Sequence, residues 1–348
     1  MIKRILFVGD YDKEYNRTKI LADGLGHLGV EINHFPFKKH TREVQKDIRE
    51  LSKDIDIIFL PSFTHKDVKF VKQNSHCPVV FDPLISRYLT KVFDFKQVSR
   101  FSPRAYKNYL KDKIAFKYAD KIIADTEAHK KYYIQKFKVP SEKIEVVEVG
   151  VDCKTFYPQS QNLSKSEFIV GFYGGFIPLQ GVLNIVKTAQ ILSSEKDIVF
   201  KLIGNGYEYD KINKYILEHK ITNVELQGWI DYKDLPSAIN QFDICLGIFG
   251  ETPKAEMVIP NKIYHYASCR KAIITKETKG IKEVFSHNDN IVLCSSNPKD
   301  IAEAIVRLKN NDTERKQIAE TGFKLISENY NSNTIAEKLL KIANRIVD

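Results

Sequence analysis

The sequence contains little cysteine and no long apolar run, and each absence excludes a class of protein. Its 348 residues include five cysteines, which are widely spaced and odd in number, and neither a Cys-x-x-Cys nor a His-Glu-x-x-His pattern occurs. This favours reduced, buried thiols over disulfides or a metal site. No apolar stretch approaches the roughly 18 residues of a membrane-spanning helix, and the N-terminus begins a strand pattern without a secretory leader. We therefore expect a cytoplasmic globular protein.

The charge is not evenly balanced along the chain. Lys and Arg number 54 against 44 Asp and Glu. Residues 1–150 hold 29 basic and 20 acidic side chains, whereas residues 151–348 hold 25 and 24. A one-sided positive field suits an anionic membrane surface, a phosphate-bearing ligand or nucleic acid, and a solvated lysine-rich surface explains it equally well. Because no motif of a known nucleic-acid-binding fold is present, we do not expect nucleic acid as a partner.

Strand and helix patterns alternate along the chain in two series. Apolar runs at 2–8, 30–35, 56–60, 78–81 and 121–124 alternate with helical spacing at 18–28, 43–53, 66–73 and 104–119. A second series places strands at 168–172, 198–203, 224–226, 244–249 and 272–275, and helices at 183–192, 210–220 and 235–241. Repeated units of this kind indicate parallel sheets covered on both faces. Residues 84–103 match neither pattern and are expected to be irregular.

The two series predict an α/β protein with two Rossmann-like, doubly wound domains. We place the first domain at 1–155 and the second at 166–325, on either side of a polar linker. The remaining residues, 326–348, are expected to form a helix that packs back toward the first domain.

One stretch, 246–275, carries the strongest functional pattern. Its sequence is LGIFGETPKAEMVIPNKIYHYASCRKAIIT, in which a strand, a polar loop, a helix start and another strand follow one another. This order gathers backbone N–H groups and lysines around an anion at the carboxyl end of a parallel sheet. Glycine turns follow two other strands, at Gly174-Gly175 and Gly204-Asn205-Gly206. They would let the backbone approach a diphosphate, although a tight turn explains them as well.

The same stretch resembles the donor-site signature of glycosyltransferase family 4, Pro-x-Lys-x-x-Glu-Tyr-x-Ala-x-Gly-Lys-Pro-Val-Ile. The matching positions are Pro260, Asn261, Lys262, Tyr264, Tyr266, Ala267, Lys271 and Ile274, whereas His265 replaces the glutamate. The segments KIIADTEAHK, KIEVVEVGVDCKTFYP and GWIDYKDLPSAINQFDICLG resemble further parts of this family in the same order. The segment FYGGFIPLQGV suggests a subgroup with a "fiPLxGv" donor loop.

The resemblance implies the GT-B architecture, with two Rossmann-like domains facing across a cleft. The first domain would bind the acceptor and the second a nucleotide-sugar donor. The reaction implied is sugar transfer from a nucleotide diphosphate to a hydroxyl group, with retention at the anomeric carbon and without a metal or another cofactor.

The resemblance also assigns donor-binding residues. The first loop would bring Gly174, Gly175 and Phe176 to the diphosphate, but residues 176–180 lack the Arg and Lys that the family places there. We expect Lys254 and Lys262 to replace that pair and to act as catalytic residues that stabilise the leaving diphosphate. His265 would meet the ribose, although a neutral imidazole nitrogen bonds only one hydroxyl. The other expected donor contacts are Gly204, Gly206, Trp229, Pro260, Asn261 and Tyr264. Trp229 fits base packing and a core position equally well.

Acceptor-binding residues are expected in the first domain. Gly9 and Asp10 end the first strand, Arg17 lies near the start of the first helix, and Arg87 follows the fourth strand. Asp82, at the end of that strand, is expected to orient a reacting hydroxyl as a catalytic residue, although Asp-Pro is also a plain turn.

These features predict a glycosyltransferase that acts on a saccharide, a glycan or a lipid-linked intermediate. We expect a role in polysaccharide biosynthesis for the cell envelope, in the cytoplasm or peripherally at the inner membrane face. The alternative is a partner subunit of the same fold that binds nucleotide sugars with weakened catalysis, as His265 and the missing Arg/Lys pair suggest. The sugar, the nucleotide, the acceptor, the linkage and the oligomeric state stay open.

Overall fold

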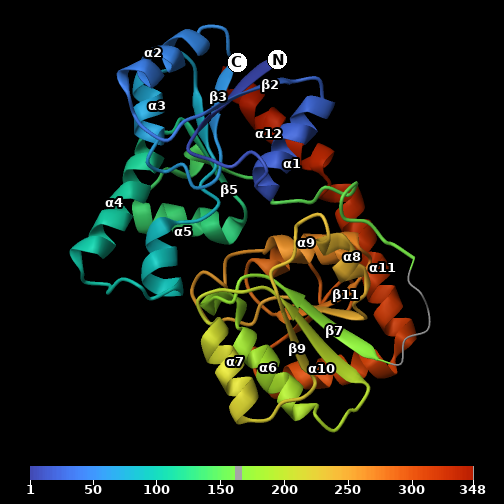
Figure 1. Ribbon diagram of the computed structural model, residues 1–348. Helices are drawn as coiled ribbons and strands as arrows, with labels where there is room; N and C mark the ends of the chain where they lie inside the picture. The colour runs from blue at the N-terminus through green and yellow to red at the C-terminus, as the bar shows by residue number, and fades with distance from the viewer. Residues whose placement is uncertain (161–166, 348) are drawn as a thin grey trace. The chain divides into compact units, whose positions relative to one another are not determined.

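The computed structural model describes residues 1–160 and 167–347, which form two compact α/β units (Figure 1). The first unit consists of Met1–Gly150 together with Tyr330–Asp348, and the second of Val151–Asn329. The predicted boundary at 155 therefore falls within the second unit. The predicted start of the second domain at 166 and the last residue of the C-terminal segment, 348, lie outside the described residues.

The first unit contains a six-stranded parallel sheet with the order β2-β1-β3-β4-β5-β6. The strands are β1 (Arg4–Gly9), β2 (Glu31–Pro36), β3 (Ile57–Leu60), β4 (Val79–Phe81), β5 (Lys121–Ala124) and β6 (Ile144–Val146). The helices are α1 (Asn16–His27), α2 (Arg42–Leu51), α3 (Val68–Asn74), α4 (Pro103–Tyr118), α5 (Glu127–Phe137) and α12 (Ser332–Val347). A short 3-10 helix, η2 (Ser141–Lys143), precedes β6.

Helices cover both faces of this sheet because side chains of a strand point alternately to its two sides. Ile5 and Phe7 of β1 pack in a cluster with α1 and α12, whereas Leu6 and Val8 pack in a cluster with α2, α3, α4 and α5. Residues 84–103 were expected to be irregular, but they contain the π-helix η1 (Leu89–Asp94).

The second unit contains another six-stranded parallel sheet, with the order β12-β11-β10-β7-β8-β9. Its strands are β7 (Phe168–Tyr173), β8 (Ile198–Ile203), β9 (Val224–Gly228), β10 (Ile244–Leu246), β11 (Ala272–Lys276) and β12 (Val292–Cys294). Its helices are α6 (Val182–Ile191), α7 (Tyr209–Glu218), α8 (Leu235–Asn240), α9 (Asn261–Ser268), α10 (Pro298–Asn310) and α11 (Asp312–Asn329). The 3-10 helices η3 (Pro178–Gln180) and η4 (Ile281–Glu283) lie between them.

The strand orders locate one favoured ligand site in each unit. In an open parallel sheet, ligands bind outside the carboxyl ends of the strands, where the direction of the chain's progress across the sheet reverses. That point lies between β1 and β3 in the first unit and between β7 and β10 in the second. Both units therefore have the doubly wound, Rossmann-like topology that the sequence predicts.

The C-terminal helix α12 belongs to the first unit, where it packs closely on α1. The contact depends on Gly24, because a Cβ atom there would lie 2.2 Å from the Ser332 carbonyl oxygen and 2.7 Å from the Ala336 Cβ. The first turns of α12 thus approach the backbone of α1 at Gly24, where α1 has no side chain.

We expect Gly24→Ala to lower the free energy of unfolding by about 1–3 kcal/mol, because the added methyl group forces α1 and α12 apart. Gly26→Ala is the matched control, since a Cβ at Gly26 meets nothing within 4 Å. The control should be neutral or stabilising by up to about 1 kcal/mol through helix propensity. Urea unfolding of both variants measures the difference, and equal stabilities would contradict the packing argument.

Candidate functional site

The loops that follow β7, β8, β9 and β10 are tied together by their backbones at the carboxyl end of the second sheet. Gly174 N donates to Ile203 O at 2.9 Å, and Gly204 N donates to Gly228 O at 2.6 Å. Phe176 N donates to Asn205 O, also at 2.9 Å. The structure thus brings the predicted residues Gly174, Gly175, Phe176, Gly204 and Gly206 into one place.

Two of these glycines are required by backbone approach. Gly204 has φ +143°, and a Cβ atom there would lie 2.0 Å from Gly174 O. Gly174 has φ +145°, and its Cβ would lie 2.8 Å from the Lys262 Nζ. Because side chains rarely adopt such backbone angles and have no space here, the loop presents bare backbone beside the Lys262 amine.

Lys262 lies in the first turn of α9 and its side chain is buried. Its Nζ donates to Gln180 Oε1 at 2.6 Å and lies 3.5 Å from the centre of the Phe172 ring. Burial holds the pKa of the Lys262 ammonium well below its ordinary value of 10.5. An anion that reached this amine would favour its charged form and would also meet the positive end of the α9 dipole.

The residues around Lys262 have different surroundings. Pro260 is the N-cap of α9 and Asn261 its first residue, and Lys254 is buried in the loop between β10 and α9. Tyr264 is fully buried and packs edge-on against Phe285, so its side chain belongs to the core rather than to a donor surface. A donor contact of Tyr264 would have to use its backbone and stays a prediction.

Phe176 and Trp229 are the two other aromatic residues that the sequence predicts to contact the donor. The Phe176 side chain is fully buried between Phe172 and Tyr209, so that only its backbone is available to a donor. Trp229 is 64% exposed just after β9, which shows that the core interpretation of this residue was wrong. Its packing on a nucleotide base stays a prediction.

His265 is enclosed within the second unit. Its ring stacks on Phe156 with centroids 3.8 Å apart, and its Nδ1 lies 2.6 Å from the Tyr173 hydroxyl. Burial lowers the pKa of His265 to about 3, so the imidazole is neutral near pH 7. A carboxylate in this enclosed position would be costly, which explains why an imidazole fits here. The ribose contact stays a prediction that would have to use Nε2, which has no hydrogen-bond partner within 1–160 and 167–347.

Arg17 and Asp82 are both buried and pair with each other in the first unit. Arg17 Nε lies 2.5 Å from Asp82 Oδ2, and the guanidinium also donates to the carbonyls of Val147 and Glu148. Burial raises the pKa of Asp82, against the opposing effect of the Arg17 charge. The pair thus joins α1 to the end of β4. Arg17 and Asp82 are also predicted to bind the acceptor, and Asp82 to act in catalysis. Their burial does not favour these roles, because it leaves almost none of either side chain accessible to a ligand.

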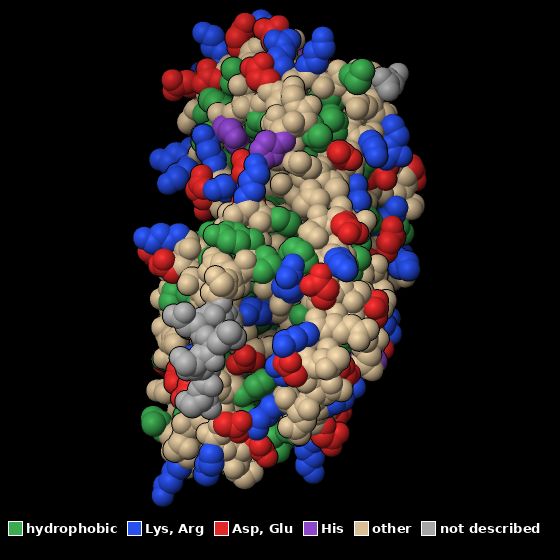
Figure 2. Space-filling view, turned by 90° about the vertical axis from the view of Figure 1, so that its right-hand side faces the viewer, with side chains coloured by type: hydrophobic (Ala, Val, Ile, Leu, Met, Phe, Trp, Pro, Cys, Tyr) green, Lys and Arg blue, Asp and Glu red, His purple; other side chains and the backbone are tan. Residues whose placement is uncertain are grey.

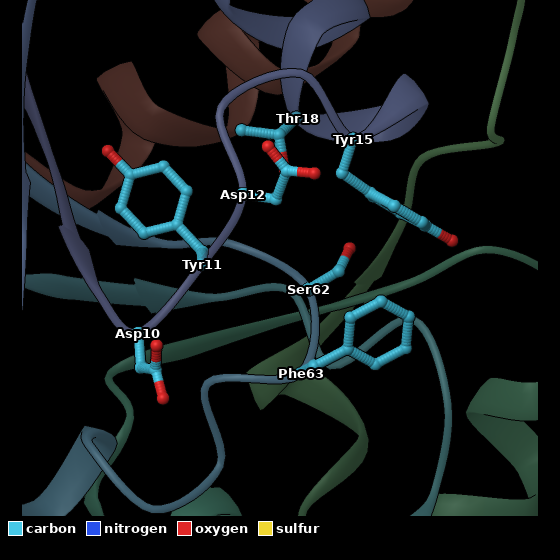
Figure 3. Close-up of a pocket in the computed structure, with 7 residues that line it drawn as sticks. All are labelled: Asp10, Tyr11, Asp12, Tyr15, Thr18, Ser62 and Phe63. Carbon is cyan, nitrogen blue, oxygen red and sulfur yellow. The ribbon is translucent and has the colours of Figure 1, made fainter. Parts of the chain in front are cut away.

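A pocket of about 300 Å³ lies at the topological switch point of the first unit (Figure 3). The loop after β1 and the start of α1 contribute Asp10, Tyr11, Asp12, Tyr15 and Thr18, and the loop after β3 contributes Ser62 and Phe63. Figure 3 shows the Ser62 side chain pointing toward Tyr15, whereas Tyr11 and Asp10 point to other sides.

The polar and aromatic groups of this pocket have distinct environments. Ser62 is buried, and its Oγ has no hydrogen-bond partner in the described parts of the chain. Tyr15 and Phe63 pack edge to face with ring centroids 5.1 Å apart, and Phe63 has the strained φ of +72°. Strain of this kind is typical of functional sites in proteins.

The predicted acceptor residues are only partly in this pocket. Asp10 lines it and forms an ion pair with Lys66 at 2.6 Å, and Gly9 directly precedes Asp10. Arg87 lies in the loop after β4, where its backbone N donates to Asp112 Oδ1. The sequence interpretation missed Asp12, Tyr15, Ser62 and Phe63. The end of the first strand at Gly9 and Asp10 was the signal that pointed to this loop, and Asp10 does line the pocket.

The described residues, 1–160 and 167–347, contain neither a metal-binding cluster nor a membrane-spanning helix. Within them, no group of three His, Cys, Asp or Glu side chains could hold a metal ion. None of the described helices has the length and apolar character needed to cross a membrane.

Comparison with known proteins gives three kinds of likeness. A family model described as "Glycosyl transferase-like" matches residues 185–341. The uncharacterized glycosyltransferase MJ1178 of Methanocaldococcus jannaschii is 26% identical over 229 residues, which cover 62% of this chain and 58% of that protein. The uncharacterized glycosyltransferase MJ1069 of the same organism is 22% identical over 244 residues, which cover 68% and 61%. The matches span less than two thirds of either relative.

Solved structures extend the likeness over nearly the whole chain. Anabaena Alr3699/HepE in complex with UDP superimposes with a TM-score of 0.76 at 16% identity, covering 98% of this chain and 100% of that one. Sucrose-phosphate synthase of Thermosynechococcus elongatus gives a TM-score of 0.77 at 14% identity, covering 99% and 98%. The chain therefore has the GT-B fold. In sequence, the chain is similar to a glycosyltransferase family model over residues 185–341 and to two glycosyltransferases over part of their length.

The buried Lys262 amine should make stability depend on pH. Its folded pKa is lowered, so between that value and 10.5 the unfolded chain binds more protons and stability rises with pH. We expect Lys262→Met to remove a slope of up to about 1 kcal/mol per pH unit in this window. Urea unfolding at about pH 8 and about pH 10 measures it. Lys233→Met, at a side chain that is 77% exposed, is the control, and an unchanged slope in Lys262→Met would refute the interpretation.

Proposed function

We propose that this protein transfers a sugar from a nucleotide-diphosphate sugar to a hydroxyl acceptor. The observation that carries the proposal is the buried Lys262 amine at the start of α9, beside the bare Gly174 backbone. It lies at the carboxyl edge of a Rossmann-like sheet, near the β7–β10 switch point. Backbone N–H groups, a helix dipole and an amine without a carboxylate hydrogen-bonded to it are suited to a diphosphate.

In this mechanism the bound diphosphate favours the charged form of the Lys262 amine. The bond between the anomeric carbon and the diphosphate oxygen then breaks, and the Lys262 ammonium stabilises the charge on that oxygen. The acceptor oxygen forms the new bond to the anomeric carbon on the same face, and its proton passes to the leaving diphosphate. The anomeric configuration is thereby retained, and we propose that no metal takes part. Lys254 would add a second positive charge from the preceding loop.

The donor class is proposed from the structural neighbours. Alr3699/HepE is described in complex with UDP, with UDP and glucose, and with UDP-glucose. We infer that UDP and UDP-hexoses are the first ligands to test. Trp229 and His265 are the side chains from which we propose that the preference for nucleotide and sugar arises.

The acceptor is proposed to enter the pocket of the first unit. Ser62 and Asp12 would bond hydroxyl groups there, and the Tyr15 and Phe63 rings would pack on the apolar face of a sugar. A phosphate fits this pocket less well, because its lining residues include two aspartates and no Lys or Arg. The proposed acceptor is thus the saccharide part of a glycan or of a lipid-linked intermediate. This fits polysaccharide assembly for the cell envelope at the cytosolic membrane face.

A second candidate is a partner subunit that binds nucleotide sugars with weakened catalysis. The enclosure of His265 and the missing Arg/Lys pair in the first donor loop favour it. Transfer by the isolated chain would exclude this candidate, whereas UDP binding without turnover in the presence of saccharide acceptors would support it.

We expect UDP to raise the melting temperature of the wild-type chain, since a ligand that binds only the folded state stabilises it. Lys262→Met should weaken UDP affinity by about 10-fold or more, because a charge-assisted contact is worth roughly 1.5–3 kcal/mol. Thermal-shift titration with UDP, ADP and GDP measures this. Lys233→Met serves again as the control. Absence of any nucleotide-dependent shift in the wild type would sink the proposed function.

The acceptor pocket predicts a separate kinetic effect. Ser62→Ala and Asp12→Asn should raise the KM for the acceptor by about 5- to 10-fold and leave UDP affinity unchanged, because each removes about 1 kcal/mol of hydrogen bonding. Steady-state transfer assays with saccharide acceptors test it. Asp231→Asn, at a side chain that is 75% exposed, is the matched control for Asp12→Asn. Acceptor kinetics that match the wild type in both pocket variants would place the acceptor elsewhere.

A further inference from the structure

The surplus positive charge of the first 150 residues comes from one continuous segment. Residues 84–138 contain 14 Lys and Arg but only five Asp and Glu. The other residues of 1–150 contain 15 of each. The segment covers the loop after β4, the π-helix η1, α4, β5 and α5. The surplus therefore has one structural location.

Most of the acidic side chains of this segment do not face solvent. Asp94, Asp112 and Asp125 are buried. Asp112, for instance, accepts hydrogen bonds from Ser86 Oγ and from the backbone N–H group of Tyr88. Asp120 pairs with Lys72. This leaves Glu127 as the exposed carboxylate within the segment.

Helix α4 shows the surplus most clearly. It carries five basic residues and one acidic residue, and the acidic residue is the buried Asp112. Arg104, Lys107, Lys113 and Lys117 are exposed. On the face that Figure 2 presents, basic and acidic side chains are interspersed over most of the surface.

Aromatic side chains lie beside these cations. Phe101, just before α4, is 91% exposed, and Tyr106 in its first turn is 62% exposed. Both line a surface pocket of about 350 Å³ with Arg100 and Lys136. Lys136 Nζ lies 4.8 Å from the centre of the Tyr88 ring, and Tyr106 stacks on Tyr109. Large exposed aromatic residues with cations on either side mark an interaction surface.

We propose that the surface formed by 100–117 and Lys136 docks on an anionic lipid bilayer. The cations would lie at the headgroups, where each basic residue adds attraction, and Phe101 and Tyr106 would enter the interfacial layer. Nucleic acid is less favoured, because the sequence contains no motif of a known nucleic-acid-binding fold. This surface lies outside the proposed donor and acceptor sites. It would bring the chain to a lipid-linked acceptor.

Vesicle flotation of the full chain tests the proposal. Wild-type protein should float with vesicles of phosphatidylcholine mixed with phosphatidylglycerol, should stay behind with phosphatidylcholine alone, and should be released by added salt. No flotation with the anionic vesicles would overturn the proposal. So would equal flotation with both lipids, because it would show that the surplus charge has no part.

Variants then locate the surface. Arg104→Glu/Lys107→Glu should weaken partition into anionic vesicles by about 10-fold or more at low salt, and Phe101→Ser should also weaken it there, because its ring would enter the interfacial layer. Lys214→Glu/Lys233→Glu makes the same change of charge in the second unit, at side chains that are 73% and 77% exposed, and should partition like the wild type. Equal partition of the two double variants would overturn the assignment. So would tighter binding of a single-stranded oligonucleotide than of the vesicles.

The UDP-dependent rise in melting temperature separates this proposal from the proposed function. It should be the same in the wild type and in all three variants, which would also show that they are folded. A chain that floats but does not respond to nucleotides refutes the proposed function and leaves the docking surface in place. A chain that responds to UDP but does not float with anionic vesicles refutes the docking surface and leaves the proposed function in place.

Discussion

The burial of one amine beside bare backbone is the constraint on which the donor side of this protein depends. The Lys262 Nζ occupies the space that a side chain at position 174 would need. The backbone of Gly174 in turn occupies the space that a side chain at position 204 would need. The amine is held by two uncharged partners, the Gln180 amide oxygen and the Phe172 ring. Burial disfavours the charged form of the lysine, and the attraction of a bound anion would offset this desolvation. Bare backbone and a buried amine that is bonded to an amide oxygen thus suit the diphosphate of the proposed donor.

The two units apply one architectural rule with different side chains. A parallel sheet covered on both faces offers its strand ends as the natural binding place, and the switch point selects which ends. In the second unit that edge carries glycines and a lysine, suited to phosphate. In the first it carries a serine hydroxyl, an aspartate and two aromatic rings, suited to a sugar. The proposed division between donor and acceptor follows from this contrast, and the basic surface of α4 adds a third, separate task.

Several residues that the sequence predicts to be functional are also held by contacts inside their own unit. Arg17 and Asp82 neutralise each other and join α1 to β4, and Tyr264 fills the core. His265 is held between Phe156 and Tyr173. Each pattern marked a polar or aromatic residue at a strand end or helix start, which is where both ligands and internal ion pairs occur. Sequence spacing cannot separate these cases, because the difference lies in which neighbours cover the side chain.

The sequence by itself predicted the two doubly wound units and most of their strands and helices, since apolar periodicity and turn residues are local properties. It did not predict β6, β12 or the π-helix η1. The structure alone decided the partners of Lys262, the enclosure of His265 and the pocket around Ser62 and Phe63. It also decided that α12 packs on α1 at Gly24 and that Asp112, the acidic residue of α4, is buried. These are contacts between residues far apart in the chain, whose free energies depend on burial and direction, and no local pattern of residues encodes them.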